Sequence, residues 1–198
     1  MVKNFTLLLL LIGFSLTAIA QNPFSGDKSS YVYTYSLTDN DDWDNGQYLL
    51  TIEVANDDDS GLKLNWTTDK ALKGTEEGSI SVSGDLMESS QKVMDNPKSK
   101  LSGATAFWLS EIVYKHMINQ TDIAIDLGNG ESTFSYVNNS QFNFDFNEVE
   151  YSANVIVFES QTEAETIEVY GDYDYGNPVI LSLSTDDWIL ELESIETK

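Results

Sequence analysis

The 198-residue chain is strongly acidic: 33 Asp and Glu residues face 10 basic ones, and the formal net charge is −23. Such a charge repels phosphate backbones and anionic lipids, so we expect neither nucleic acid nor an anionic membrane as a partner. The chain has no Cys, which excludes disulfides, thiolate catalysis and cysteine-ligated metals. Cations, basic proteins and neutral sugars stay open as partners.

Residues 1–20 have the pattern of a secretory signal peptide. Lys3 supplies the positive charge, residues 7–16 form the apolar core, and Ala18-Ile19-Ala20 is a small-x-small cleavage site. The apolar core is shorter than the roughly 20 residues that a membrane anchor needs. We therefore expect an exported, soluble protein, periplasmic or extracellular, that is cleaved near Ala20.

The remaining chain is divided into a short lead-in and one domain. Residues 21–30 are polar and contain Pro23 and Gly26, which predicts a flexible lead-in. From residue 31 to residue 198, short runs alternate apolar and polar residues, as half-buried strands do. Such runs begin at Tyr31, Tyr48, Leu62, Ile80, Ile123, Phe134, Phe142, Val149, Ile167, Val179 and Trp188, the run at Ile80 being the weaker one. These runs predict a single β-rich domain.

The predicted fold class is mainly β: an antiparallel β-sandwich or barrel of about ten strands. One apolar face per run favours antiparallel pairing, because parallel strands are buried on both faces. Two turns fit this arrangement, an acidic one at residues 57–61 and an Asn129-Gly130 hairpin turn. Trp66, Trp108 and Trp188 lie in periodic segments and are interpreted as core residues.

One amphipathic helix is predicted near residues 105–119. Its apolar face would contain the only histidine, and Glu111 and Lys115 would form an i,i+4 pair outside that face. We interpret His116 as a core residue, which leaves no histidine for a catalytic triad or a multi-histidine metal site. The other residues of the predicted apolar face are Ala106, Leu109, Ile112, Val113 and Met117.

The strongest candidate cofactor is calcium, in the loop that follows the first predicted strand. Oxygen-bearing side chains are crowded there and Gly46 ends the loop; hard cations bind such ligands in flexible loops. The spacing departs from the EF-hand pattern, and a solvated turn has the same composition. The candidate metal ligands are Asp39, Asp41, Asp42, Asp44 and Asn45.

Aromatic rings beside carboxylates form a second candidate site, for glycan contact. Rings can stack on sugar faces while carboxylates accept hydrogen bonds from hydroxyls, although rings in loops also cap β cores. Trp43 lies in the acidic loop, and a later loop alternates tyrosines with aspartates. The candidate ligand-binding residues are Trp43, Tyr170, Asp172, Tyr173, Asp174 and Tyr175.

Catalytic patterns are weak in this sequence, so whether it is an enzyme stays open, and we favour a non-enzyme. Asp59-Ser60-Gly61 matches the triplet of aspartic proteases but is also a natural hairpin turn. Glu191 and Glu193 would lie about 7 Å apart on one strand face, within the range for an inverting glycosidase. Surface strands commonly carry this alternation without catalysis.

Three functional classes follow. We favour a secreted, non-enzymatic binding or accessory module with an extracytoplasmic ligand or protein partner, contacting calcium or a glycan. The first alternative is a carrier of a small apolar molecule, similar to lipocalins, with a cavity lined by rings. The second is a carboxylate-dependent hydrolase that uses Asp59 or the Glu191–Glu193 pair. The rings available to a carrier cavity are Tyr33, Phe142, Phe144 and Phe146.

Overall fold

The computed structural model describes residues 22–24, 27–39, 46–58, 61–70, 74–93, 104–171 and 179–198. Its strands are β1 (Tyr31–Asp39), β2 (Gly46–Asp58), β3 (Gly61–Lys70), β4 (Gly74–Ser83), β5 (Ile123–Asp126), β6 (Glu131–Phe146), β7 (Val149–Ser160), β8 (Thr166–Tyr170), β9 (Ile180–Ser184) and β10 (Trp188–Thr197). The helices are η1 (Lys28–Ser30), α1 (Gly84–Ser89) and α2 (Glu111–Ile118). The predicted mainly β fold of about ten strands is confirmed.

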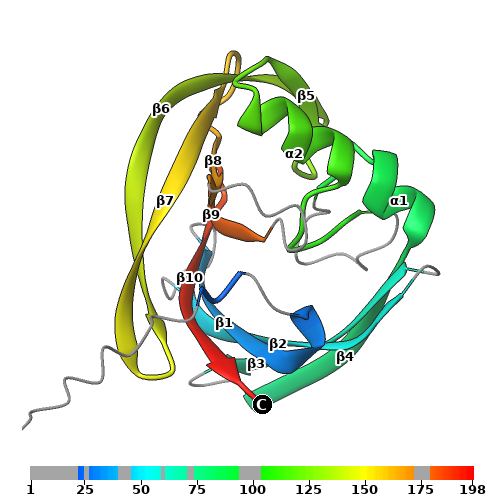
Figure 1. The fold of residues 1–198 in the computed structure, drawn as a ribbon, viewed down its shortest axis with the longest axis vertical. Coiled ribbons are helices and arrows are strands. Elements are labelled where there is room, and N and C mark those ends of the chain that lie inside the picture. The colour runs from blue at the N-terminus through cyan, green and yellow to red at the C-terminus, as the bar shows by residue number, and fades with distance from the viewer. Residues whose placement is uncertain are drawn as a thin grey trace, which may run out of the picture.

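All ten strands belong to one sheet, in the order β4-β3-β2-β1-β10-β9-β8-β7-β6-β5. Neighbouring strands are antiparallel, and β10 also pairs in parallel with the end of β6 at Ser194–Asp145 and Ile195–Phe146. The sheet therefore curls, and hydrogen bonds close a ring through β6, β7, β8, β9 and β10. The two α-helices lie between the edge strands β4 and β5 (Figure 1).

The β6–β7 hairpin is the longest ribbon of the sheet. Sequence periodicity predicted separate runs at Phe134 and Phe142, but β6 is one strand of 16 residues. Its register against β7 shifts between Tyr136 and Asn138, and such a bulge changes which residues share a face. The bulge explains why the two runs look independent in the sequence.

Tight turns join the strands of this half. Asp126 Oδ1 accepts hydrogen bonds from the N–H groups of Gly128 (2.8 Å) and Gly130 (3.1 Å), which have φ angles of +103° and +111°. The predicted hairpin therefore forms between β5 and β6. Asn147 and Glu148 join β6 to β7 with φ angles of +50° and +64°, typical of a two-residue hairpin turn.

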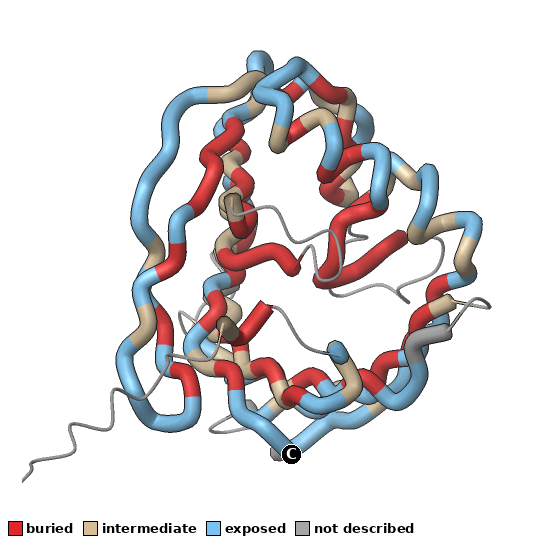
Figure 2. The backbone as a smooth tube through the Cα atoms, viewed as in Figure 1, coloured by how far each residue is buried: buried red, intermediate tan, exposed pale blue. Residues whose placement is uncertain are grey.

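The interior of the curled sheet is filled by aromatic side chains. Trp108 is fully buried, and its ring packs edge-on against Tyr33 with centroids 5.2 Å apart. Phe107 packs against Tyr35 at 5.5 Å, and the Tyr35 hydroxyl donates to the Ile180 carbonyl at 3.0 Å. Residues 104–110 are all buried, whereas buried and exposed residues alternate along most strands (Figure 2). Trp108 and Trp188 are core residues, as predicted, and Trp66 is half-buried.

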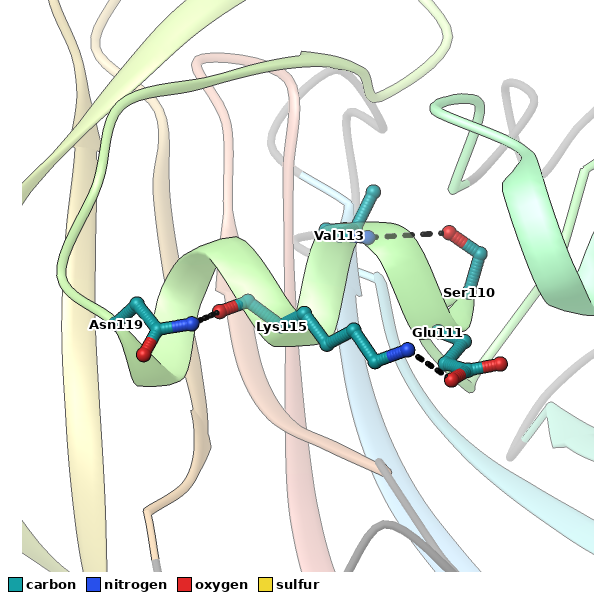
Figure 3. A network of polar contacts seen from close by, with 5 residues as sticks. All are labelled: Ser110, Glu111, Val113, Lys115 and Asn119. Atoms are coloured by element: carbon teal, nitrogen blue, oxygen red, sulfur yellow. Dashed lines mark hydrogen bonds and ion pairs between the residues drawn. The ribbon is translucent and has the colours of Figure 1, made fainter.

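Helix α2 is shorter than predicted and presents a different face. It begins after Ser110, whose Oγ accepts from the Val113 N–H at 3.4 Å (Figure 3). The preceding chain is not helical, and Ala106 has a φ of +62°, a conformation that interrupts a right-handed helix. The face buried against the sheet is formed by Val113, Tyr114 and Met117.

His116 is not the core residue that the longer helix predicted. It is half-buried, and its Nδ1 lies 2.9 Å from Thr121 Oγ1 in an exposed contact. Ile112 is also largely outside the core, at 39% exposure. The Glu111–Lys115 ion pair does form (Figure 3). The error follows from the helix start, because a shorter helix places a different set of residues against the sheet.

The lead-in also differs from the prediction. Pro23 and Phe24 are buried, and η1 begins after Asp27, whose carboxylate accepts from the Ser29 N–H at 2.9 Å. The N-terminal residues that the structure describes therefore pack on the core. Within the described part of the chain, no helix is both long enough and apolar enough to cross a membrane. The predicted signal peptide lies outside the described residues.

Candidate functional site

A groove of about 680 Å³ lies between the end of α2 and the β6–β7 ribbon. Its polar lining includes four amide side chains: Gln120, Asn139, Gln141 and Asn154. Ile118 and Ile156 add apolar surface. Volumes of 300–1,000 Å³ are typical of small-molecule sites, so the groove has the size of a ligand site.

The register of the hairpin brings two of the amides together. Gln141 of β6 lies opposite Asn154 of β7, and cross-strand partners share one face of a sheet. Gln141 Nε2 donates to Asn154 Oδ1, and Ser152 Oγ donates to Gln141 Oε1 at 2.8 Å. These contacts hold the two amides in one orientation along the groove.

The opposite wall is the C-terminal end of α2. Asn119 ends the helix, and its Nδ2 donates to the Lys115 carbonyl at 2.8 Å (Figure 3). Gln120 follows with a φ of +55°, and its N–H donates to the Met117 carbonyl at 3.0 Å. Glycine is the usual residue at this left-handed position. The chain instead places there a glutamine that lines the groove.

Gly171 lines the groove next to β7. Its N–H donates to the Asn154 carbonyl at 2.9 Å. A Cβ on Gly171 would lie 3.0 Å from Ile156 Cγ1 and 3.4 Å from the Asn154 carbonyl oxygen, so a larger residue would have to displace the Ile156 side chain. This contact ties the end of β8 to the strand that carries Asn154.

The described residues that line the groove carry no charge, in a chain of net charge −23. None of its described lining residues is Asp, Glu, Lys or His. Amide groups donate and accept hydrogen bonds without carrying charge. The site therefore suits a polar ligand without charge.

Most of the predicted calcium loop lies outside the described residues. Asp39 is the last residue of β1, and the other proposed ligands, Asp41, Asp42, Asp44 and Asn45, lie outside the described residues. Calcium binding by this loop therefore stays a prediction. Elsewhere, the described residues contain no group of three or more His, Asp or Glu side chains that could hold a metal ion.

The predicted aromatic site is contradicted at the one residue that is described. Tyr170 is 2% exposed at the end of β8, so its ring does not form a surface for sugars. The remaining members, Trp43, Asp172, Tyr173, Asp174 and Tyr175, lie outside the described residues. Four of them, Asp172, Tyr173, Asp174 and Tyr175, follow Gly171 in the sequence.

One residue of the predicted carboxylate pair on β10, Glu191, lies near a third carboxylate, Glu168 of β8. Glu191 and Glu193 are exposed. The pairing of β1 with β10 shifts by one residue between Thr34 and Tyr35, so Glu193 has no partner on β1. Ser182 pairs with both Glu191 and Glu168. Burial, and then the charge of Glu191, raise the pKa of Glu168. Asp59 and Ser60 lie outside the described residues.

Glu165 is a second perturbed carboxyl, away from the groove. It is 4% exposed, and its Oε2 has no hydrogen-bond partner among the described residues. Burial raises its pKa, and the charges of Glu163, Asp126 and Asp186 raise it further. A hydrogen bond with Ser132 opposes this shift.

Sequence reasoning missed the groove. The run from Asn138 to Gln141 is polar and uncharged within a strongly acidic chain, which is the one signal that points to it. The partners Asn154 and Gln120 come from other elements, so only the hairpin register and the position of α2 bring the amides together.

No protein-family model matches the chain, and no curated protein or solved structure shows significant similarity to it. The fold and the groove define a mainly β protein with one curled ten-strand sheet and a groove whose described lining is rich in amides and carries no charge.

Proposed function

We propose that this protein is an exported, non-enzymatic binding module whose groove takes an uncharged, hydroxyl-rich ligand, a short neutral glycan. The observation that carries the proposal is the set of four amides around an uncharged groove in a highly acidic chain. Amides are suited to sugar hydroxyls because each amide offers both donors and an acceptor. Ile118, which is partly exposed, supplies apolar surface for the C–H groups of a sugar ring.

The backbone at Gln120 supports a binding role for this residue. A non-glycine residue with φ near +55° costs roughly 1–2 kcal/mol. Strain of this kind is often retained where a side chain is needed at a site. At this position the strain places the Gln120 amide in the groove wall.

The packing of the core favours a binding module over an apolar carrier. Three of the rings proposed to line a carrier cavity instead contact other rings of the protein. Tyr33 packs on Trp108, Phe144 on Phe24 and Phe146 on Tyr31, with centroids 5.2, 5.7 and 6.3 Å apart. Such contacts leave the rings engaged with the core rather than with a ligand.

Titration of isotopically labelled protein with chitotriose, cellotriose and maltotriose, monitored by NMR, tests the proposal. A sulfated heparin trisaccharide serves as the anionic comparison. We expect a neutral trisaccharide to shift the Gln141 and Asn154 side-chain amides and the Gly171 backbone amide. Preferential binding of the sulfated sugar, or no shift at these groups with any of the neutral sugars, contradicts the proposal.

A further inference from the structure

The first described residues of the chain pack against the end of β8. Phe24 is fully buried, and its ring lies 4.1 Å from the Tyr170 ring and 5.7 Å from the Phe144 ring, measured between centroids. Asn22 Nδ2 donates to the Tyr170 hydroxyl at 2.9 Å, and Asn22 Oδ1 accepts from the Phe24 N–H at 2.9 Å. We call residues 22–24 the strap.

Tyr170 connects the strap to the walls of the groove. It pairs with Val155 of β7, and its backbone carbonyl accepts a hydrogen bond from the Tyr114 hydroxyl of α2 at 3.0 Å. The next residue, Gly171, lines the groove and binds the Asn154 carbonyl. Tyr170 therefore contacts the strap, helix α2 and strand β7.

The strap contacts the face of the strands opposite the one that carries the Asn154 side chain. Side chains alternate between faces along a strand, and Tyr170 is the partner of Val155. The Tyr170 ring therefore points to the face opposite that of Asn154 and Ile156, which line the groove, and shares its face with Val155, which lines the groove as well. No residue of the strap is among the described residues that line the groove, so the strap contacts the groove only through Tyr170 and its neighbours.

We propose that docking of the strap on Tyr170 controls the groove, by fixing the end of β8 and its contacts with α2 and β7. An exported chain with an intact segment 22–24 has a preorganised groove, whereas loss of Phe24 separates its walls. Pro23 favours docking of the strap, since proline reduces the conformational freedom that docking removes. The effect on ligand affinity rests on the proposed function; the effect on the structure does not.

Hydrogen exchange at the Gly171 amide tests the structural effect without any ligand. In the full chain with Phe24→Ala we expect this amide to exchange at least tenfold faster, because the ring contacts with Tyr170 are lost. Amides of β2 and β3 should exchange at unchanged rates, as they should in Leu49→Ala, an exposed control on β2. Unchanged exchange at Gly171, or equal acceleration throughout the sheet, overturns the proposal.

Asn22→Ala and Tyr170→Phe keep the test decisive if Phe24→Ala does not fold. Tyr170→Phe removes only the hydrogen bond between the two side chains, whereas Asn22→Ala also removes the acceptor of the Phe24 N–H. Each should therefore accelerate Gly171 exchange by a few fold, and the double variant should exchange no faster than Asn22→Ala. Additive effects, or no effect, overturn the role of this contact. If the strap variants accelerate Gly171 exchange but no neutral trisaccharide binds the unaltered protein, the proposed function fails while the strap stands.

Discussion

Asn22 and Tyr170 are separated by 148 positions in the sequence, yet the Asn22 side chain donates a 2.9 Å hydrogen bond to the Tyr170 hydroxyl. This contact joins the start of the described chain to the strand end from which the groove is built. Residues 21–30, predicted to be a flexible lead-in, therefore contain a segment that supports the candidate site. The relationship gives the N-terminal segment a role in the fold in addition to its position after the predicted signal peptide.

Replacement of Gln120 by glycine should separate stability from binding. Gly relieves the cost of the left-handed backbone at φ +55°, so the free energy of unfolding should rise by about 1 kcal/mol. Binding of a neutral trisaccharide should weaken because an amide is lost from the groove. Chemical denaturation and NMR titration measure the two effects.

Glu148→Gly is the matched control for that variant. Glu148 has a φ of +64° in the exposed turn between β6 and β7, so the substitution should also stabilise the protein but leave binding unchanged. Equal loss of binding in both variants would show that backbone flexibility, rather than the Gln120 amide, affects the groove.

Ser110→Ala should destabilise the fold by roughly 1–2 kcal/mol, measured by urea denaturation. Ser110 Oγ caps α2 at the Val113 N–H and donates to the Ser90 carbonyl at 2.5 Å, and alanine removes both bonds. Ser83 precedes α1 in the same N-cap position but makes no side-chain capping bond. Ser83→Ala should therefore cost at most about 0.5 kcal/mol; an equal cost at both serines would contradict the assigned cap.

Glu165→Gln should stabilise the protein at neutral pH and lose that advantage in acid. The pKa of Glu165 is raised above its ordinary 4.5, so ionisation costs more in the folded state than in the unfolded chain. The free energy of unfolding of the unaltered protein therefore falls as pH rises from below 4.5 through the folded pKa. Glutamine removes this loss. Unfolding curves against pH should converge for the two proteins in acid and diverge at neutral pH.

Glu196→Gln, at an exposed position of β10, controls for the removal of one negative charge from the chain. The same gain at Glu165 and Glu196 would mean that general repulsion, rather than burial of Glu165, is responsible.

Calcium binding by the acidic loop that includes Asp41 and Asp44 predicts a specific thermal response. Millimolar CaCl2 should raise the melting temperature more than NaCl of equal ionic strength, since a bound ion stabilises the folded state by mass action. Asp41→Asn with Asp44→Asn should remove the difference. Identical shifts with the two salts would mean charge screening alone.

The strands were predictable because each has one buried face. In β1 the buried Tyr31, Tyr33 and Tyr35 alternate with partly exposed residues. This two-residue period can be recognised from neighbouring residues in the sequence alone. The start of α2 was less predictable. Sequence periodicity extended the helix back to residue 105, whereas Ala106 takes a left-handed backbone and Ser110 caps the helix.

The candidate site depends on contacts that have no local sequence signal. Gln141 and Asn154 meet through the register of a hairpin whose β6 strand contains a bulge. Gln120 reaches the same groove from the end of a helix. Tyr170 was predicted to be exposed because it begins a run of alternating aromatic and acidic residues, but Phe24 and Asn22, remote in the sequence, cover it. These contacts form only in the folded protein, where the curled sheet brings segments that are remote in the sequence together.

The most direct test of the account is calorimetric binding of neutral trisaccharides to Gln141→Ala and Asn143→Ala. Both residues lie on the same face of β6, but only Gln141 lines the groove. We predict that Gln141→Ala weakens binding of the preferred neutral trisaccharide at least tenfold, that Asn143→Ala leaves it unchanged, and that added salt has little effect on either. Equal affinities for the two variants, or affinity that falls steeply with salt, would contradict a neutral glycan in the amide-lined groove.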